Sequence, residues 1–323
     1  MKPRKTMKIS VIVCTYNRCR TLGTALESVA LSVMPPWTEW EVLVVDNNSN
    51  DQTPQVVADM SRRHPGRFRY TFESHPGKSY ALNSGIREAR GEVLAFMDDD
   101  VIVEPTWLRN LTAPLRDGQW AGVGGRILPQ WSCPPPSWVP TEDPHALALL
   151  AMFDLGVKAG PLLEPPFGTN MAFRKSAFAK YEGFRSDLGP QPGSEIRGED
   201  TEFGRRVLEA GEHLWYEPSA IVHHPVPAHR LRRQYFLRWW FDKGRSDVRE
   251  FGVPKDTKWF FAGIPLFMFR RLTAWTLRWM LAAQVSRRFS CKLKVWTMAG
   301  GIYEAYQRSS GAKAKVRGAT VEF

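Results

Sequence analysis

The stretch Glu92-Val-Leu-Ala-Phe-Met-Asp-Asp-Asp100 decides the fold class, because it joins an apolar run directly to three consecutive aspartates. A continuous apolar run of this length predicts a strand buried on both faces. Strand patterns also occur earlier, at residues 9–13, 41–45 and 68–72. Together they indicate four strands within the first 100 residues.

Helical patterns separate these strands, at residues 21–31, 52–63 and 78–90. Repeated strand–helix units with apolar strands predict an α/β fold, a mostly parallel sheet flanked by helices on both faces. Ligands of such sheets bind at the carboxyl ends of the strands. The polar residues that follow each strand are therefore the candidate site.

The charge of the chain is concentrated in its last third. The 323 residues carry a net charge of +11, yet residues 225–323 hold 20 Lys and Arg against 6 Asp and Glu. A basic region of this kind suits a partner that carries phosphates, which could be an anionic membrane surface, a lipid-linked acceptor or a nucleic acid.

The four cysteines, Cys14, Cys19, Cys133 and Cys291, match no zinc-binding spacing. We interpret them as reduced thiols of a cytoplasmic protein. The basic N-terminus is followed by an apolar run of strand length only, so the sequence indicates no signal peptide.

The second half of the chain is less regular. Residues 129–166 are rich in proline and predict a long surface excursion that could act as a lid. A strand at residues 170–173, a loop at 193–199, a helix at 200–210 and a short strand ending at His223 and His224 follow. Beyond Pro227 the chain becomes rich in arginine and tryptophan.

Three consecutive aspartates at a strand end, Asp98 to Asp100, repel one another and call for a positive partner. A divalent cation with oxygen ligands, completed by a diphosphate, is the natural candidate. An exposed acidic turn is the alternative interpretation.

Other strand ends offer groups suited to a nucleotide. Residues 15–18, Thr-Tyr-Asn-Arg, precede a helix N-terminus, and Asp46 could accept hydrogen bonds from a base or ribose. Lys78 could meet phosphate charge, with Asn83 as a polar contact on the same helix. Each feature alone is equally compatible with an ordinary polar turn or a capped surface helix.

In their order, these motifs resemble family 2 glycosyltransferases over about residues 7–250. The matching strings are Val11-Ile-Val-Cys-Thr-Tyr-Asn-Arg18, Val44-Val-Asp-Asn-Asn-Ser49 with Asp51, Gly77-Lys78 through Asn83-Ser-Gly85, Ala95-Phe-Met-Asp-Asp-Asp100, Gly168-Thr-Asn-Met-Ala172 and Gly198-Glu-Asp200. The resemblance implies a GT-A fold with a Rossmann-like nucleotide-binding half. It also implies a nucleotide-sugar donor and Mn²⁺ or Mg²⁺.

The resemblance assigns roles to these positions. Asp100 would bind the metal, and Asp98 the ribose or sugar. Because side chains alternate along a strand, only one of His223 and His224 should face the site, and the resemblance favours His224. A solvent-exposed histidine or one satisfied in the core is the alternative. The predicted nucleotide-binding residues are Thr15, Tyr16, Asn17, Arg18, Asp46, Asn48, Lys78, Asn83, Asp98 and Asp99, and the predicted metal ligands are Asp100 and His224.

On the acceptor side the resemblance places Gly198, Glu199 and Asn170, with Asp200 as the catalytic base. One carboxylate that takes the acceptor proton during attack on the anomeric carbon gives inversion. No protein acid is needed if a metal stabilises the leaving diphosphate. The alternative for Glu199 and Asp200 is a helix cap with a first-turn acid.

We expect a GT-A catalytic domain at residues 1–228 and a basic, amphipathic helical extension at 229–323. The first would comprise a nucleotide-sugar half (1–127) and an acceptor half (128–228). In the extension, residues 229–250 predict an Arg-rich helix ending near Gly244, which binds phosphates or packs on the catalytic domain.

Residues 259–285 carry arginines that would each cost roughly 2.5–3.5 kcal/mol inside a bilayer, so they do not predict a membrane span. A helix lying in the interface of an anionic membrane fits better, at the inner face of the plasma membrane. A helix covering this protein or a second subunit is the alternative. Residues 309–323 are expected to fray.

The predicted function is therefore an inverting transfer of a sugar, from a UDP-sugar by preference, to a glycan or lipid-linked acceptor in cell-surface polysaccharide synthesis. A sugar nucleotidyltransferase is one alternative, but residues 15–18 lack the glycine of a triphosphate-binding loop. A basic nucleic-acid-binding protein is another alternative. That function would not explain the acidic strand end, and the sequence contains no recognised nucleic-acid-binding module. A degenerate scaffold is disfavoured because each motif position holds a competent residue. The sequence specifies no oligomeric state.

Overall fold

The computed structural model describes residues 6–143, 146–254 and 256–318. Its contacts divide the chain into two compact units. Of the described residues, unit 1 contains those of Met1–Gln130, Leu150–Gly193 and Glu199–Pro225. Unit 2 contains those of Trp131–Leu149, Ser194–Gly198 and Val226–Phe323.

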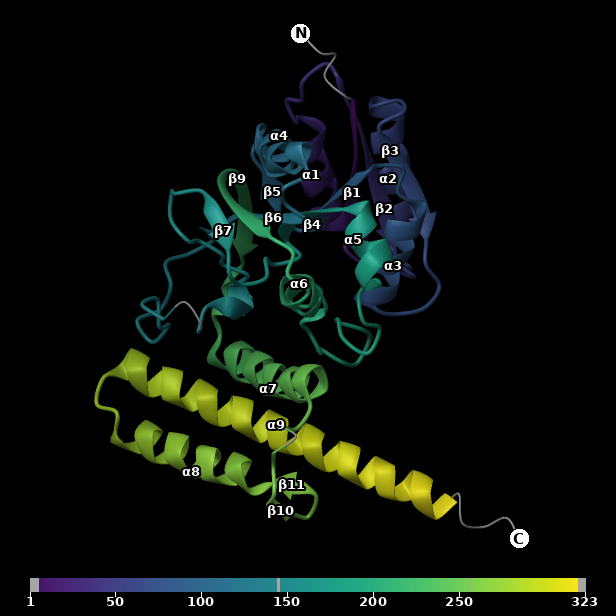
Figure 1. Ribbon diagram of the computed structural model, residues 1–323. Coiled ribbons are helices and arrows are strands. Elements are labelled where there is room, and N and C mark those ends of the chain that lie inside the picture. Colours follow the sequence, from purple (N-terminus) through teal and green to yellow (C-terminus); the bar gives the residue numbers. More distant parts are fainter. Residues whose placement is uncertain (1–5, 144–145, 255, 319–323) are drawn as a thin grey trace. The chain divides into compact units, whose positions relative to one another are not determined.

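A large mixed sheet forms the centre of unit 1, with the strand order β3-β2-β1-β4-β8-β6-β9-β5, and β7 pairs with β9 (Figure 1). The four strands predicted first pair in parallel, as β3-β2-β1-β4, whereas the later strands pair antiparallel. This confirms the α/β fold class and confines the parallel pairing to the N-terminal half. The strands are β1 (Met7–Thr15), β2 (Thr38–Asp46), β3 (Phe68–Phe72), β4 (Val93–Asp98), β5 (Ile102–Val103), β6 (Gly122–Trp131), β7 (Gly160–Leu162), β8 (Asn170–Arg174) and β9 (Leu214–Val226).

Helices cover both faces of this sheet because successive side chains of its strands point to opposite sides. Val11 and Val13 of β1 pack in a core with α1, α2 and α4, and Ile12 packs in a second core with α3, α5 and α6. The helices are α1 (Cys19–Ala30), α2 (Thr53–Arg63), α3 (Lys78–Glu88), α4 (Trp107–Thr112), α5 (Lys175–Tyr181) and α6 (Glu199–Glu209).

The proline-rich stretch is partly regular. It contains the end of β6, the 3-10 helix η2 (Ala148–Leu150) and β7, which pairs with β9. The strand predicted to end at His224 runs on to Val226. A further 3-10 helix, η1 (Ala113–Asp117), follows α4.

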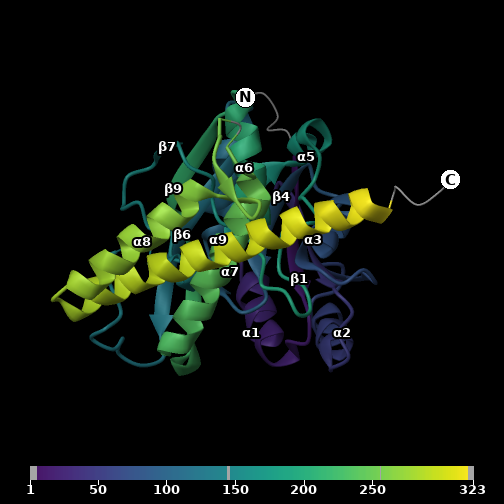
Figure 2. The same ribbon diagram turned by 90° about the horizontal axis from the view of Figure 1, so that it is seen from below.

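Unit 2 is helical. α7 (Arg233–Phe251) and α8 (Leu266–Leu281) both pack against α9 (Val285–Gly318), and Figure 2 shows α8 alongside α9. A short hairpin of β10 (Phe260–Phe261) and β11 (Ile264–Pro265) precedes α8, and η3 (Ala228–Leu231) precedes α7.

Two predictions for unit 2 were wrong. The Arg-rich helix does not end near Gly244, because this glycine lies inside α7, where a Cβ would collide with the Thr297 carbonyl group of α9. Gly300 of α9 meets the Phe241 carbonyl group in the same way. The glycines therefore allow close helix packing. Of residues 309–323, which were predicted to fray, those up to Gly318 are helical, and residues 319–323 lie outside the described part of the chain.

The segment predicted as one interfacial helix, residues 259–285, is a hairpin followed by α8. Within the described part of the chain, no helix combines the length and the apolar character needed to cross a membrane.

Candidate active site

The carboxyl ends of three parallel strands lie side by side in unit 1. In the register of the sheet, Thr15 of β1 stands beside Asp46 of β2, and Cys14 stands beside Asp98 of β4. The polar residues that follow these strands therefore share one edge of the sheet, as expected for a ligand site in this class of fold.

Two basic side chains meet the acidic triplet. Lys78 Nζ lies 2.8 Å from Asp98 Oδ1. Arg18 Nη1 lies 3.2 Å from Asp99 Oδ1 and 2.8 Å from Asp100 Oδ2. Both cations come from residues predicted to bind the nucleotide. They supply the positive charge that three adjacent carboxylates require.

The carboxyl groups of the triplet have different pKa values. Desolvation alone would raise the pKa of Asp98, but the charge of Lys78 and the hydrogen bonds from Lys78 and Thr169 hold it well below its usual value. Burial raises the pKa of Asp99 to about 6, although the nearby charge of Arg18 opposes this rise. Asp98 is thus the more firmly ionised of the two.

Asp100 and His224 form a donor pair of the kind that divalent cations use. His224 is buried, and its Nε2 atom lies 3.9 Å from Asp100 Oδ1. Among the described residues, no group of three or more His, Cys, Asp or Glu side chains is placed to hold a metal ion. Carboxylate oxygen and imidazole nitrogen are both atoms that divalent cations accept as ligands.

His223 faces a different partner. Its Nε2 atom lies 3.2 Å from Glu104 Oε1, away from Asp100. The alternation of side chains along β9 thus separates the two histidines.

The loops after β1 and β2 hold each other in place. The Asn17 backbone N–H donates to Ser49 Oγ at 2.9 Å, and the Asn50 N–H donates to Asn17 Oδ1 at 2.8 Å. Tyr16, Asn17 and Asn48 are exposed beside them, and both asparagines have positive φ angles, 51° and 71°. The side chains of Tyr16 and Asn48 thus remain accessible to a ligand.

Asp46, by contrast, is buried, and both of its carboxylate oxygen atoms accept hydrogen bonds from the protein. Its Oδ2 atom accepts the Tyr70 hydroxyl at 2.8 Å, and its Oδ1 atom accepts the Ser49 N–H at 2.9 Å. Desolvation and this carboxylate raise the pKa of Tyr70 to about 12. Asp46 therefore shapes the strand-end turn. Thr15, also buried, lies next to it in the sheet.

Asn47 was missed by the sequence analysis. Its Oδ1 atom accepts the Gly77 N–H at 2.7 Å, and its Nδ2 atom donates to the carbonyl groups of His75 and Glu73 at 2.7 and 3.2 Å. This amide fixes the loop that leads into α3 and so positions Lys78. Asn47 lies inside the string Val44 to Ser49, which resembles the family motif, and this position was the signal that could have identified it.

Thr169 was also missed. Its hydroxyl donates to Asp98 Oδ2 at 2.6 Å, opposite the oxygen atom that Lys78 contacts. The position lies in the matched string that begins at Gly168, but spacing alone does not show which strand end it faces.

The predicted acceptor side begins at α6. Gly198 has a φ of 102° and directly precedes the helix, whose first residue, Glu199, is buried. Asp200 Oδ2 accepts the Gly168 N–H at 2.6 Å, and Oδ1 accepts the Thr201 N–H at 2.7 Å. Both oxygen atoms of the proposed base are thus oriented by backbone groups.

Lys78 connects this side with the acidic triplet, because its Nζ atom also lies 3.8 Å from Glu199 Oε1. Desolvation disfavours its charged form, but the carboxylates of Asp98, Glu199 and Asp200 raise the pKa of Lys78 above its usual value. The lysine is therefore a permanent cation.

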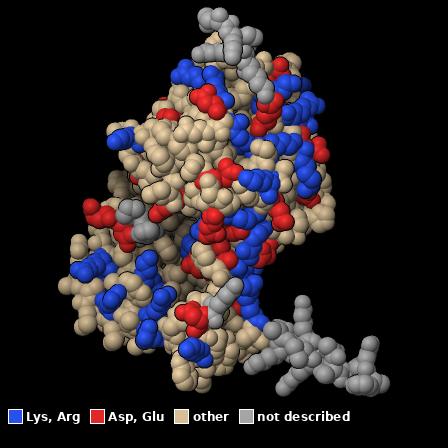
Figure 3. All heavy atoms as spheres, in the orientation of Figure 1, with Lys and Arg blue, Asp and Glu red and all other residues tan. Residues whose placement is uncertain are grey.

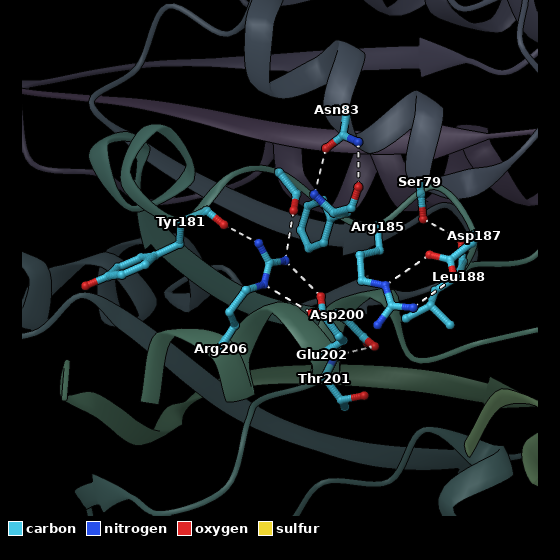
Figure 4. Close-up of polar contacts among 12 residues, drawn as sticks. Ser79, Asn83, Tyr181, Arg185, Asp187, Leu188, Asp200, Thr201, Glu202 and Arg206 are labelled. Atoms are coloured by element: carbon cyan, nitrogen blue, oxygen red, sulfur yellow. Dashed lines mark hydrogen bonds and ion pairs between the residues drawn. The ribbon is translucent and has the colours of Figure 1, made fainter. Parts of the chain in front are cut away.

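The loop after α5 ties α3 to α6 (Figure 4). Asn83 receives the Phe184 N–H and donates to the Phe184 carbonyl group, both at 2.8 Å, and Ser79 donates to the Leu188 carbonyl group at 2.7 Å. From α6, Arg206 donates to the carbonyl groups of Tyr181 and Gly183. Asn83, predicted to contact the nucleotide, thus uses its amide to anchor this loop.

Asn170 is completely buried. Its Oδ1 atom accepts the Trp107 Nε1–H at 2.8 Å, and its Nδ2 atom donates to the carbonyl groups of Arg126 and Ala220 at 3.0 and 2.8 Å. Such burial argues against the predicted contact with an acceptor. Asn170 instead joins β6, β8, β9 and α4.

The chain is similar to known glycosyltransferases. Residues 10–182 match the family model described as Glycosyl transferase family 2. The chain is 28% identical over 248 residues to the succinoglycan biosynthesis protein ExoM of Rhizobium meliloti, covering 76% of each chain. It is 26% identical over 247 residues to a glucosyl-dolichyl phosphate glucuronosyltransferase of Haloferax volcanii, covering 74% of this chain and 76% of that one.

Among solved structures, the mannosyltransferase PcManGT of Pyrobaculum calidifontis, in complex with GDP-Man and Mn²⁺, has a TM-score of 0.55 to this chain. The match has 18% sequence identity and covers 97% of this chain and 80% of the other. At that identity the likeness shows the GT-A fold.

Proposed function

The chain belongs to glycosyl transferase family 2, and from this premise we propose that it is an inverting enzyme of cell-surface polysaccharide synthesis. It moves a sugar from a nucleotide diphosphate, UDP by preference, to a hydroxyl group of a glycan or a lipid-linked acceptor. The names of two relatives support these acceptor classes. One is a succinoglycan biosynthesis protein, and the other is a glucosyl-dolichyl phosphate glucuronosyltransferase.

The observation that carries the proposal is the position of Lys78. Its ammonium group lies 2.8 Å from Asp98 and 3.8 Å from Glu199, so one cation joins the acidic strand end to the first turn of α6. A donor bound at the strand ends and an acceptor bound at Asp200 would then meet at this lysine.

Asp200 is the proposed base. The backbone N–H groups of Gly168 and Thr201 orient its carboxylate. The carboxylate takes the proton of the acceptor hydroxyl while that oxygen attacks the anomeric carbon from the face opposite the leaving group, which inverts the configuration. Lys78 holds phosphate charge beside the reacting centre. Tyr16 and Asn48 offer exposed contacts to the nucleoside.

Asp100 and His224 would hold the divalent cation, Mn²⁺ or Mg²⁺. When bound, the cation would supply positive charge to the departing diphosphate. Arg18 contacts Asp100 at 2.8 Å, so we expect this arginine to shift when a cation and a diphosphate bind.

We further propose that residues 1–228 form the catalytic domain and that residues 229–323 attach the enzyme to the inner face of the plasma membrane. The high content of arginine and lysine in residues 225–323, 20 against 6 acidic residues, supports this attachment.

A donor screen tests the proposal. Purified protein is incubated with UDP-, GDP- and dTDP-sugars and candidate acceptors, and nucleotide release is measured with Mn²⁺, with Mg²⁺ and with a chelator. We expect release from one donor class, with the metal and acceptor both required, and its loss in Asp100→Ala. Absence of acceptor-dependent release from every donor would contradict the proposal.

A further inference from the structure

The outward side of α8 is apolar and exposed. Of its residues only Met268 is buried, whereas Leu277, Met280 and Leu281 are exposed by 55%, 62% and 83%. The sequence from residue 257 to residue 303 contains eight Lys and Arg and no Asp or Glu. Unit 2 therefore presents apolar side chains within a purely basic stretch, which is the composition of a surface that binds anionic bilayers.

A hollow of about 890 Å³ lies within unit 2, where α8 turns into α9. Trp275, Arg278 and Leu281 line it from α8, and Arg287 and Lys294 line it from α9. The spacing of three to seven residues within each helix places the lining side chains of that helix on one side of it. Figure 3 shows Lys and Arg side chains gathered at this end of the helix pair.

Two of the three cations that line the hollow lie beside aromatic rings. Arg278 stacks on the Trp275 ring at 4.7 Å, and Lys294 lies 5.2 Å from the Trp240 ring. Within the described part of the chain, none of the three, Arg287 included, forms an ion pair. The single acid of the lining, Asp143, accepts the Ala146 N–H at 3.2 Å. The hollow thus has an excess of positive charge.

We infer that this hollow is a binding site for the phosphate headgroup of an anionic membrane phospholipid, with Arg278, Arg287 and Lys294 as its ligands. The inference rests on the membrane attachment proposed above and gives it a specific site. Guanidinium and ammonium groups suit phosphate oxygens. The exposed Leu277, Met280 and Leu281 favour a lipid over a free phosphate, because acyl chains can cover them once the headgroup is held.

Vesicle co-sedimentation of the full chain tests the site. The vesicles contain phosphatidylcholine alone or with 30% phosphatidylglycerol, a proportion that is roughly that of an anionic bilayer. The test variant is Arg278→Gln/Arg287→Gln/Lys294→Gln. Its control, Arg116→Gln/Lys158→Gln/Arg288→Gln, removes the same charge from exposed residues outside the lining. Each residue of the site contributes about fivefold, so the test variant should bind anionic vesicles about 100-fold more weakly.

A second pair of variants is more closely matched. Arg287 and Arg288 are neighbours on α9, both exposed, and only Arg287 lines the hollow. Arg287→Gln should weaken binding to anionic vesicles about fivefold, and Arg288→Gln should have little effect. Equal losses in the two variants would overturn the inference and leave a diffuse basic surface.

Other outcomes also separate the possible occupants. Millimolar inorganic phosphate that abolishes vesicle binding would indicate a site for a free anion, and this would overturn the inference. A dimer that is lost in the triple variant, without vesicle binding, would indicate a second copy of the chain. Nucleotide release with a soluble acceptor should be unchanged in all these variants. If the unmodified enzyme releases no nucleotide, the proposed function is contradicted. The vesicle results would still show whether the hollow binds a lipid headgroup.

Discussion

At the scale of single residues, Lys78 decides how charge is arranged in the candidate site. Its ammonium group is the cation closest to Asp98, and it also faces Glu199, whose side chain is buried. Without it, two carboxylates would share a poorly solvated space, where like charges repel strongly. The ammonium group of Lys78 therefore supplies the counter-charge that lets these carboxylates lie close together.

The base role of Asp200 gives a prediction at this scale. Asp200→Asn keeps the size of the side chain but cannot accept the acceptor's proton. We expect turnover to fall about 10²- to 10⁴-fold, the usual contribution of a general base, while donor affinity stays unchanged. Turnover is measured by nucleotide release and affinity by calorimetry.

Asp59→Asn is the matched control for this variant, because Asp59 is an exposed residue of α2 that pairs with Arg62 on the surface. Its turnover should equal that of the unmodified enzyme. Undiminished transfer in Asp200→Asn would remove Asp200 from the base role.

At the scale of elements, one carboxylate joins the first residues of α1 and α2. Asp51 Oδ2 accepts the Cys19 N–H at 3.0 Å, and Oδ1 accepts the N–H and hydroxyl of Thr53 at 3.0 and 2.6 Å. Desolvation opposes the charge, but these hydrogen bonds lower the pKa of Asp51 to about 2. The two helices that follow the loops after β1 and β2 thus begin at a common anion.

Asp51→Ala should reduce the free energy of unfolding by about 2 kcal/mol at pH 7, since hydrogen bonds to a charged acceptor are lost. Because the pKa is lower in the folded state, this stabilisation is complete above pH 4 and disappears as the pH falls through about 2. In urea titrations between pH 2.5 and 7, the difference between the two proteins should therefore become smaller towards the acid end. Asp117→Ala, an exposed carboxylate, should show no such trend.

The packing of α7 on α9 gives a second prediction for the elements. Gly244→Ala places a methyl group against the Thr297 carbonyl group and should destabilise unit 2 by at least 1–3 kcal/mol, the usual cost of overpacking. Gly23→Ala is the control within α1, where the nearest atom to the added carbon is Val56 Cγ1 at an ordinary 3.8 Å. It should be neutral or stabilising by up to about 1 kcal/mol. Equal melting curves by circular dichroism for the two variants would disprove the close approach.

At the scale of the whole molecule, a ligand that binds only the folded chain increases the stability of that chain. A nucleotide sugar at 100 times its dissociation constant should stabilise the protein by about 2.7 kcal/mol, which raises the melting temperature by a few degrees. We expect this rise with Mn²⁺ and not with a chelator, and we expect Asp100→Ala to abolish the difference. The same rise in the presence of a chelator would remove the cation from donor binding.

The sequence determined the class of fold because strand and helix periods are local. The apolar run 93–97 and its relatives at β1 and β2 could bury themselves only in a sheet covered on both faces. Parallel strands then brought Thr15, Asp46 and Asp98 to one edge, so their common location was also predictable.

Only the tertiary structure decided which of these polar groups face a ligand and which hold the fold. Asn83 contacts Phe184, 101 positions away, and Thr169 contacts Asp98 across 71 positions. Asn170 is buried at a junction of strands, and Gly244 lies against a carbonyl group of another helix. A polar residue in a strand-end motif has the same local pattern in either role. Its partner is set by packing between distant segments, and no period in the sequence encodes that distance.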